Sequence, residues 1–356
     1  MNVISMVLLA FAVLGGIDRI IGNRFGLGKE FERGFMLLGN MALSMIGMIV
    51  ISPLIADLLA PCFDWFYNVL HIDPSVIPAS VFANDMGGAS LSAEVARDKD
   101  LGMFNALVVS SVMGCTISFS IPYGLGVVKK EHHKDMFLGM LCGIATIPLG
   151  CFVSGLSLGI PVLSVLLNLL PIILLSGIVA CGLILAPAAT IKAFSALGII
   201  MKTAITLGLL VGMFQSLTGI VLIKGLADIK EGADICFNAA VVLAGAFPFM
   251  AVVSRVLNKP ITKFGQLLGI NAQSAMGLVS TTVTNSTTFE MLNGMERNGI
   301  VLNSAFLVSA AFTLGSHLAF TMAFDAGYVL PMILAKLLSG VTSIPLALLI
   351  YKRVCK

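Results

Sequence analysis

The run Asn84-Asp85-Met86-Gly87-Gly88 interrupts a segment, residues 74–93, that is otherwise long enough to span a membrane. A second such segment, residues 272–293, is interrupted by the polar run Ser280-Thr281-Thr282-Val283-Thr284-Asn285-Ser286-Thr287-Thr288. Polar or glycine-broken backbone is tolerated at membrane depth only where it is buried in protein or lines a cavity. If the chain lies in a bilayer, these two breaks therefore indicate an internal site.

The composition places the chain in a bilayer. Of its 356 residues, 58% are hydrophobic and only 11% are charged, against about 25% in soluble proteins, and the mean hydropathy is +1.03. This apolar excess requires lipid as the outer solvent. The net charge of +3 is too small and dispersed for a nucleic-acid partner, and the seven cysteines form no C-x-x-C metal motif. The sequence predicts an all-α polytopic protein of the inner cell membrane.

Lys and Arg counts decide whether the two broken segments cross the membrane or turn back. Nine other segments reach the length of a membrane helix, which is about 20 residues. They are residues 2–20, 35–60, 101–128, 135–157, 161–186, 199–223, 234–256, 299–324 and 328–351. If both broken segments turn back, 15 Lys and Arg lie in cytoplasmic loops and 4 outside; if both cross, the numbers are 12 and 7. The positive-inside rule thus favours about nine transmembrane spans plus two re-entrant helical hairpins.

An internal repeat supports the same arrangement. The stretch Gly143-Ile-Ala-Thr-Ile-Pro-Leu149 recurs as Gly340-Val-Thr-Ser-Ile-Pro-Leu346, and Gly15 and Gly212 have the same separation. Matches at one offset along a whole chain rarely arise by chance.

The repeat divides the chain into three parts. The first repeat is predicted over 1–158, with its hairpin at 74–93. A linker, 159–197, contains one span, and the second repeat follows over 198–356, with its hairpin at 272–293. The extra span inverts the second copy, and inverted repeats with broken helices are typical of secondary transporters, which bind substrate near the midplane.

The two hairpin tips are predicted to form the binding site. Asp85 is an intramembrane carboxylate, which marks a functional position by default, and Gly87 and Gly88 let the backbone approach a ligand. An acidic group without a nearby Lys or Arg fits a small cation or a polar neutral solute. The other candidates are polar side chains on the tips and on the spans that follow them: Asn84, Thr116, Ser118, Ser120, Thr284, Asn285, Ser286, Ser316 and His317.

Other charged residues receive structural interpretations. We expect Lys202 and Lys336, which lie inside predicted spans, to reach the membrane surface by snorkelling. Asp18 and Arg19, at the end of the first span, are expected to pair with each other.

Five stretches together resemble the ethanolamine permeases of the EutH family, and the resemblance covers essentially the whole chain. They are Gly16-Ile-Asp18-Arg19-Ile20, Phe31-Glu32-x-Gly34-Phe35-Met36, Asp85-Met86-Gly87-Gly88, Met113-Gly114-x-Thr116-Ile117-x-Phe119-Ser120-Ile121-Pro122 and Ser309-Ala310-Ala311-Phe312-x-Leu314-Gly315-x-His317-Leu318. The resemblance implies a membrane protein that imports ethanolamine for catabolism when external supply is low or when acidic pH leaves little neutral amine. Ethanolamine is mostly protonated at neutral pH, which suits an acidic tip.

The sequence departs from the family pattern in two places. Ser316 stands where the family has Asp, and Thr284-Asn285-Ser286-Thr287 stands where it has Asn-Asn-Ile-Pro. If these positions touch substrate, selectivity or coupling differs in this chain.

Several alternatives stay open. A nucleoside-type carrier also pairs opposing hairpins in inverted repeats. A membrane-embedded enzyme would need paired acid and base groups or a metal cluster inside the bilayer, and a structural subunit would not need two matched polar breaks. No cofactor or metal is expected, and a coupling proton, a coupling Na⁺ ion and uncoupled transport are all compatible with the sequence. A moving half needs a stationary scaffold, so we expect a homo-oligomer.

Overall fold

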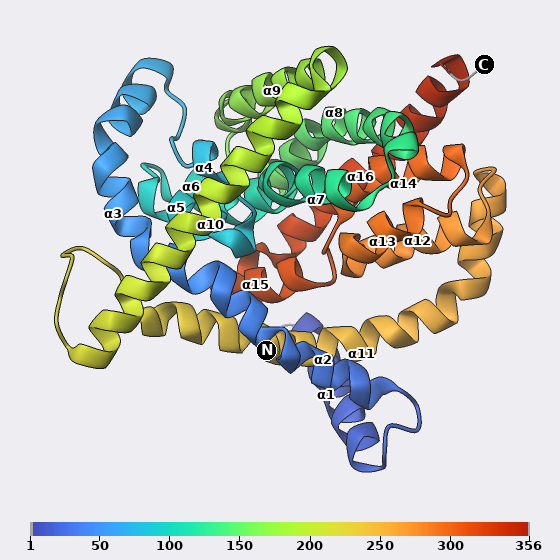
Figure 1. Cartoon of the computed structure of the whole chain (residues 1–356), viewed down its shortest axis with the longest axis horizontal. Helices are drawn as coiled ribbons and strands as arrows, with labels where there is room; N and C mark the ends of the chain where they lie inside the picture. Colours follow the sequence, from blue (N-terminus) through green and yellow to red (C-terminus); the bar gives the residue numbers. More distant parts are fainter. Residues whose placement is uncertain (1–2, 355–356) are drawn as a thin grey trace.

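A computed structural model describes residues 3–354, apart from the side chains at 187, 188, 191, 257–264, 266 and 354, and these residues contain helices and no strand (Figure 1). Within the described part, eight helical stretches are long and apolar enough to cross a bilayer. They are Val3–Ile20, Leu27–Leu70, Lys99–Val127, Lys130–Ser157, Val162–Leu185, Lys192–Thr218, Ile229–Val256 and Ser316–Arg353. The chain is a multi-pass membrane protein.

The helices follow one another with short connections. In chain order they are α1 (Val3–Ile20), α2 (Leu27–Met36), α3 (Leu38–Leu70), α4 (Val76–Val81), η1 (Asn84–Met86), α5 (Gly88–Val95), α6 (Lys99–Phe104), the π-helical η2 (Asn105–Gly114) and η3 (Thr116–Ser120), α7 (Ile121–Val127), η4 (Lys130–His132), α8 (His133–Ser157), α9 (Val162–Leu185), α10 (Pro187–Thr218), α11 (Ile229–Leu267), α12 (Ala272–Val283), α13 (Asn285–Leu292), α14 (Arg297–Ala310), α15 (Ser316–Asp325), η5 (Ala326–Tyr328) and α16 (Val329–Val354).

One predicted span is broken. Residues 299–324 were expected to form a single helix, but α14 and α15 are separated by a non-helical turn at 311–315. Phe312 adopts a φ of 59° there. The N–H groups of Phe312 and Leu314 donate to the carbonyls of Thr281 and Thr282 at 3.1 and 2.7 Å. The break is therefore held by the last turn of α12, which has free carbonyls.

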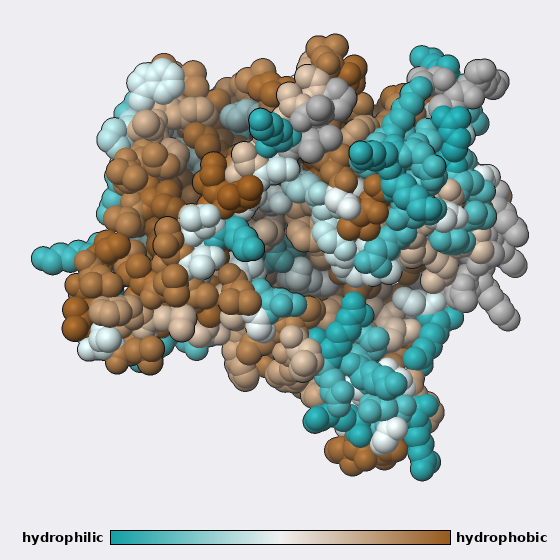
Figure 2. Space-filling view, viewed as in Figure 1, coloured by the Kyte–Doolittle hydropathy of each residue, from teal (hydrophilic) through white to brown (hydrophobic). Residues whose placement is uncertain are grey.

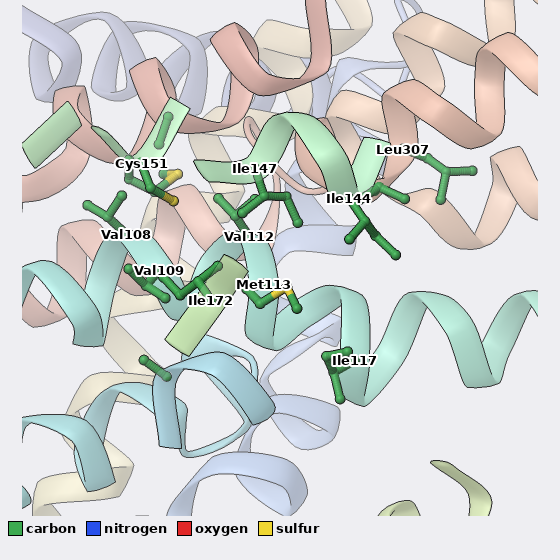
Figure 3. Packing of buried hydrophobic residues seen from close by; sticks show 14 of the residues in the cluster. Val108, Val109, Val112, Met113, Ile117, Ile144, Ile147, Cys151, Ile172 and Leu307 are labelled. Carbon is green, nitrogen blue, oxygen red and sulfur yellow. The ribbon is translucent and has the colours of Figure 1, made fainter. Parts of the chain in front are cut away.

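The core forms where α8, α14 and α16 pack against η2. Figure 3 shows Val112, Ile144, Ile147 and Leu307 of this buried cluster. Close approach depends on glycine, because a Cβ atom at Gly139 would lie 2.2 Å from the carbonyl oxygen of Val301. The polar groups described below are embedded in this tight packing.

The surface separates into apolar and polar parts. Figure 2 shows apolar side chains over the region of α3, α9 and α10, and polar side chains around α12, α13 and the end of α16. Leu174 and Ile178 of α9 are 67% and 68% exposed. Such exposure of large apolar side chains fits contact with lipid.

Both broken segments begin and end at neighbouring points. At the first, Asp73 Oδ2 accepts hydrogen bonds from the backbone N–H groups of Arg97 and Asp98 at 2.9 and 2.7 Å. At the second, the N–H of Asn271 donates to Glu296 Oε1 at 2.5 Å. The two ends of each segment therefore lie side by side.

The predicted Asp18–Arg19 pair is wrong. Asp18 instead accepts from the N–H groups of Phe25, Leu27 and Gly28 at 2.7 to 2.9 Å, so that it closes the turn after α1. Arg19 pairs with Glu32 of α2 at 2.6 Å. Three backbone N–H groups satisfy the Asp18 carboxylate better than one exposed cation would.

Candidate functional site

A cavity of about 360 Å³ lies where the two breaks meet. Asp85 and Met86 line it from the first break, and Thr284 and Ser286 line it from the second. The remaining lining residues immediately precede the two breaks or come from α2, α3, the region of η3, α11 and the segment around the start of α15: Arg33, Leu37, Asn40, Met41, Ser44, Ala83, Cys115, Phe119, Phe247, Val283, Phe312, Ser316 and His317. The two breaks, which are about 200 residues apart in the chain, thus line the same cavity.

The acidic end of this cavity continues into a line of buried polar groups. Asp85 Oδ1 lies 3.6 Å from Nε2 of His317, and their side chains are 17% and 1% exposed. On the other side of the ring, Nδ1 lies 3.1 Å from Nζ of Lys336. The Lys336 ammonium also donates to the carbonyl oxygen of Ser111 at 2.6 Å.

Lys336 does not snorkel. Its side chain is fully buried, and it points into the protein between α16, α15 and η2. The expectation that it reaches the membrane surface is wrong because both of its contacts lie on elements inside the bundle. The expectation that no Lys or Arg lies near the breaks is also wrong, since Arg33 lines the same cavity as Asp85.

Three phenylalanine side chains form the apolar wall. Phe119 and Phe312 meet edge to face with ring centroids 5.7 Å apart, and the Phe312 ring lies 5.1 Å from that of His317. Phe247 lies beneath the Arg33 guanidinium, whose central carbon is 4.7 Å from the ring centroid. Aromatic faces attract cations, so this wall and the Asp85 carboxylate favour the same kind of ligand.

The charge of Arg33 is already paired at the cavity edge. Its Nη1 lies 3.2 Å from Glu30 Oε2, one turn away on α2. The carboxylate of Asp85, by contrast, has the imidazole of His317 as its neighbour. A cationic ligand would therefore find its strongest attraction at the Asp85 end.

The predicted site residues divide into two groups. Asp85, Thr284, Ser286, Ser316 and His317 line the cavity. The others support it from behind or lie beside it: Asn84, Gly87, Gly88, Thr116, Ser118, Ser120 and Asn285.

The supporting residues hold the breaks in place. Asn285 Nδ2 donates to Ser120 Oγ at 2.9 Å, and Asn84 Nδ2 approaches Thr321 Oγ1 at 3.4 Å. Both asparagines are fully buried, so these contacts tie each break to a neighbouring helix.

Hydroxyl groups complete this support. Thr116 Oγ1 lies 2.8 Å from the carbonyl oxygens of both Val112 and Val308, which share its one hydroxyl proton, and this contact joins η3 to α14. Ser118 Oγ accepts from the N–H of Ala83 at 3.1 Å and lines a separate cavity between α3 and α10.

The two glycines of the first break permit its tight turn. Gly87 has a φ of 92°, in the left-handed region that favours glycine. A Cβ atom at Gly88 would lie 2.2 Å from the carbonyl oxygen of Phe82. The backbone therefore folds closely on itself beside Asp85.

Several lining residues were missed by sequence reasoning. Phe119 and Phe312 belong to two of the stretches that resemble the EutH family. That resemblance singles them out but does not indicate that they line a cavity. Phe247 and Arg33 lie in ordinary helical contexts. Lys336 is unusual in the sequence because it is a lysine within an apolar span. Snorkelling explains such a position as well as burial does, so the sequence alone did not reveal its contact with His317.

Comparison with known proteins identifies the relatives of the chain. The model of the family described as "Ethanolamine utilisation protein, EutH" matches residues 1–350. A Listeria monocytogenes protein named probable ethanolamine permease EutH is 42% identical over 355 residues, which cover 100% of this chain and 95% of that protein. A Salmonella typhimurium protein of the same name is 33% identical over 387 residues, covering 98% of this chain and 95% of that protein.

A third relative, the Bacillus subtilis protein YxeR, is 36% identical over 342 residues, covering 96% of this chain and 92% of that protein. No solved structure matches the chain. The family match and these relatives extend over nearly the full length of the chain. The chain belongs to the EutH family of ethanolamine utilisation proteins.

Proposed function

We propose that the chain is a secondary carrier or facilitator that imports ethanolamine by alternating access. The substrate binds near the bilayer midplane, between the breaks at 84–88 and 284–286. The observation on which this proposal rests most heavily is that Asp85 and the hydroxyl groups of Thr284 and Ser286 line one cavity. The names of the Listeria and Salmonella relatives support the choice of ethanolamine.

In this proposal each broken segment is a re-entrant hairpin. The hydrogen bonds between Asp73 and Arg97, and between Asn271 and Glu296, support it because they join the two ends of each segment. The connections before α8 and α14 also meet, since Asp135 pairs with Arg297 at 2.9 Å. If both segments crossed the membrane, these two connections would lie on opposite faces.

The two halves are inverted repeats in this proposal, with boundaries at 1–158 and 198–356. The order of elements supports the repeat. A short helix, a break and a second short helix precede a long helical segment in each half, and α4 and α12 begin at the same separation in the chain as α8 and α16. Exchange of conformation between such halves produces alternating access.

The site can distinguish the two ends of ethanolamine. The protonated amine lies against the Asp85 carboxylate and the faces of Phe119 and Phe312, as charge attraction and cation–π attraction favour. The hydroxyl group bonds to Thr284 or Ser286 of the opposite break. Because the acceptor is a carboxylate and the wall is aromatic, a protonated amine is favoured over a carboxylate or phosphate substrate.

The test is uptake of labelled ethanolamine into proteoliposomes. We expect saturable uptake that propanolamine reduces more strongly than uridine. Asp85→Asn should lower uptake to the level of empty liposomes, whereas Asp234→Asn, an exposed carboxylate at the start of α11, should leave it unchanged. Uptake near the wild-type level in Asp85→Asn, or stronger competition by uridine, would contradict the proposal.

The hairpin arrangement has a test of its own. In a variant without the native cysteines, His71→Cys and Asp100→Cys are both expected to react with an impermeant maleimide from outside. Both positions are exposed. Reaction of the two from opposite sides would rule out a hairpin over 74–93, because these residues flank that segment.

A further inference from the structure

A buried lysine lies behind the wall of the cavity, separated from it by the imidazole of His317. Lys336 lies behind His317, and its described polar contacts are Nδ1 of His317 and the carbonyl oxygen of Ser111. No carboxylate oxygen of the described residues lies within 4.0 Å of it, as an ion pair would require. A buried ammonium without a direct counter-ion is costly.

The imidazole can link this ammonium to the nearest carboxylate. An ammonium group has only hydrogens to donate, so Nδ1 of His317 accepts, and the neutral ring then has its proton on Nε2. Nε2, which carries this proton, lies 3.6 Å from Asp85 Oδ1. With Lys336 positive, His317 neutral and Asp85 negative, the line of three groups has no net charge.

A substrate cation disturbs this balance. When a protonated amine binds Asp85, the line gains a second positive charge in a buried site. Loss of one proton from Lys336 restores neutrality, and the remaining amine keeps its hydrogen bonds within the bundle.

We propose that Lys336 holds the coupling proton, which the carrier exchanges through His317 for one bound substrate cation. The juxtaposition of Asp85 and His317 in the cavity wall with Lys336 directly behind them supports this inference, which rests on the proposed function. Transport of the cation in one direction is then matched by movement of a proton in the other.

The proton transfer balances without another reactant. An N–H bond of Lys336 breaks as one forms at Nδ1 of His317. The Nε2–H bond of His317 breaks as its proton passes to cavity water, because the imidazole lines the cavity. The products are a neutral lysine, a neutral imidazole with its proton on Nδ1, and an Asp85 carboxylate free to hold the amine.

Other titratable groups near Lys336 do not supply an alternative charge. Besides His317 on α15 and Asp85 on η1, the groups that face it are the thiols of Cys115, between η2 and η3, and Cys151 on α8. Both thiols are buried. A thiol is a weak donor that packs as a small apolar group when buried.

The test counts the protons released per ethanolamine bound. Calorimetric titration of the purified protein in two buffers of different ionisation enthalpy measures this number directly. We expect one proton for the wild type and none for Lys336→Gln, which still binds ethanolamine. Lys202→Gln, which removes an exposed lysine of α10, should still release one proton.

The outcomes separate this inference from the proposed function. Absence of ethanolamine binding to the wild type would overturn both, whereas binding without proton release would overturn the inference alone. Release of one proton from Lys336→Gln would also overturn it, because the proton would then come from a group other than Lys336. Lys336→Arg provides a second variant if Lys336→Gln does not fold: arginine stays charged, so binding should persist more weakly and release no proton.

Discussion

Each of the two breaks lies between two short helices, but the breaks differ in chemistry. The first has a carboxylate, Asp85, and a left-handed glycine, Gly87. The second has neither: Thr284 is extended, and Asn285 is tied to Ser120. One break therefore supplies charge and the other supplies neutral hydrogen-bonding groups, so a substrate with one cationic and one hydroxyl end can contact both.

The largest expected effect comes from removing the charge of the first break. Asp85→Asn should weaken ethanolamine binding at least about 30-fold, because truncating one partner of a buried charge pair costs roughly 2 to 5 kcal/mol. Ser286→Ala at the second break should cost less than about tenfold, as for a neutral hydrogen bond. Equilibrium binding to both purified variants measures this ratio, and equal losses would refute the division of roles.

Glycine substitution tests how tightly the backbone of the first break is packed. Gly88→Ala should lower the free energy of unfolding by up to about 3 kcal/mol, since the new Cβ would overlap backbone atoms that cannot move aside. Gly16→Ala in α1 is the control, because no atom lies within 4 Å of its added Cβ. Denaturation in mixed micelles measures both, and a fully stable Gly88→Ala protein would show that the first break can relax.

The ends of the two segments differ as well. Asp73 is buried and accepts hydrogen bonds from the N–H groups of Ser75, Arg97 and Asp98. Asp73→Asn should therefore cost about 2 kcal/mol of unfolding free energy, in the range for bonds to a charged group. Glu296→Gln, at the exposed end of the second segment, should cost less. The prediction fails if the order is reversed in the same denaturation assay.

The smallest effect concerns the two buried asparagines. A double-mutant cycle of Asn285→Ala and Ser120→Ala should give a coupling of about 1 kcal/mol, as expected for one neutral hydrogen bond. The equivalent cycle of Asn84→Ala and Thr321→Ala should give a smaller coupling because the contact is longer, at 3.4 Å against 2.9 Å. A stronger coupling for the Asn84 pair than for the Asn285 pair would contradict the prediction that the second break is held more firmly.

The features that could be predicted are those that depend only on residues close together in the sequence. A polar run inside an apolar segment is visible without any partner, so both breaks and eight of the nine full spans were located from composition alone. Asp85 and His317 stood out for the same reason, since ionisable groups inside spans are rare.

Features that depend on distant partners were not predicted. Lys336 is buried because the packing of α15, α16 and η2 directs it inward, and no pattern within its own helix records this. The turn at 311–315 contains no proline and depends on carbonyls about 30 residues earlier in the chain. The π-helical course of η2 likewise has no signature that periodicity can detect.

The turn at 311–315 has a mechanical consequence. Its two backbone hydrogen bonds to Thr281 and Thr282 join the end of α12 to the connection between α14 and α15. In the proposed alternating access, a displacement of α12 would either carry this turn with it or break both hydrogen bonds where little water is available to replace them. Joint movement costs less free energy, so the proposed motion would involve α12, α13, α14 and α15 as one unit.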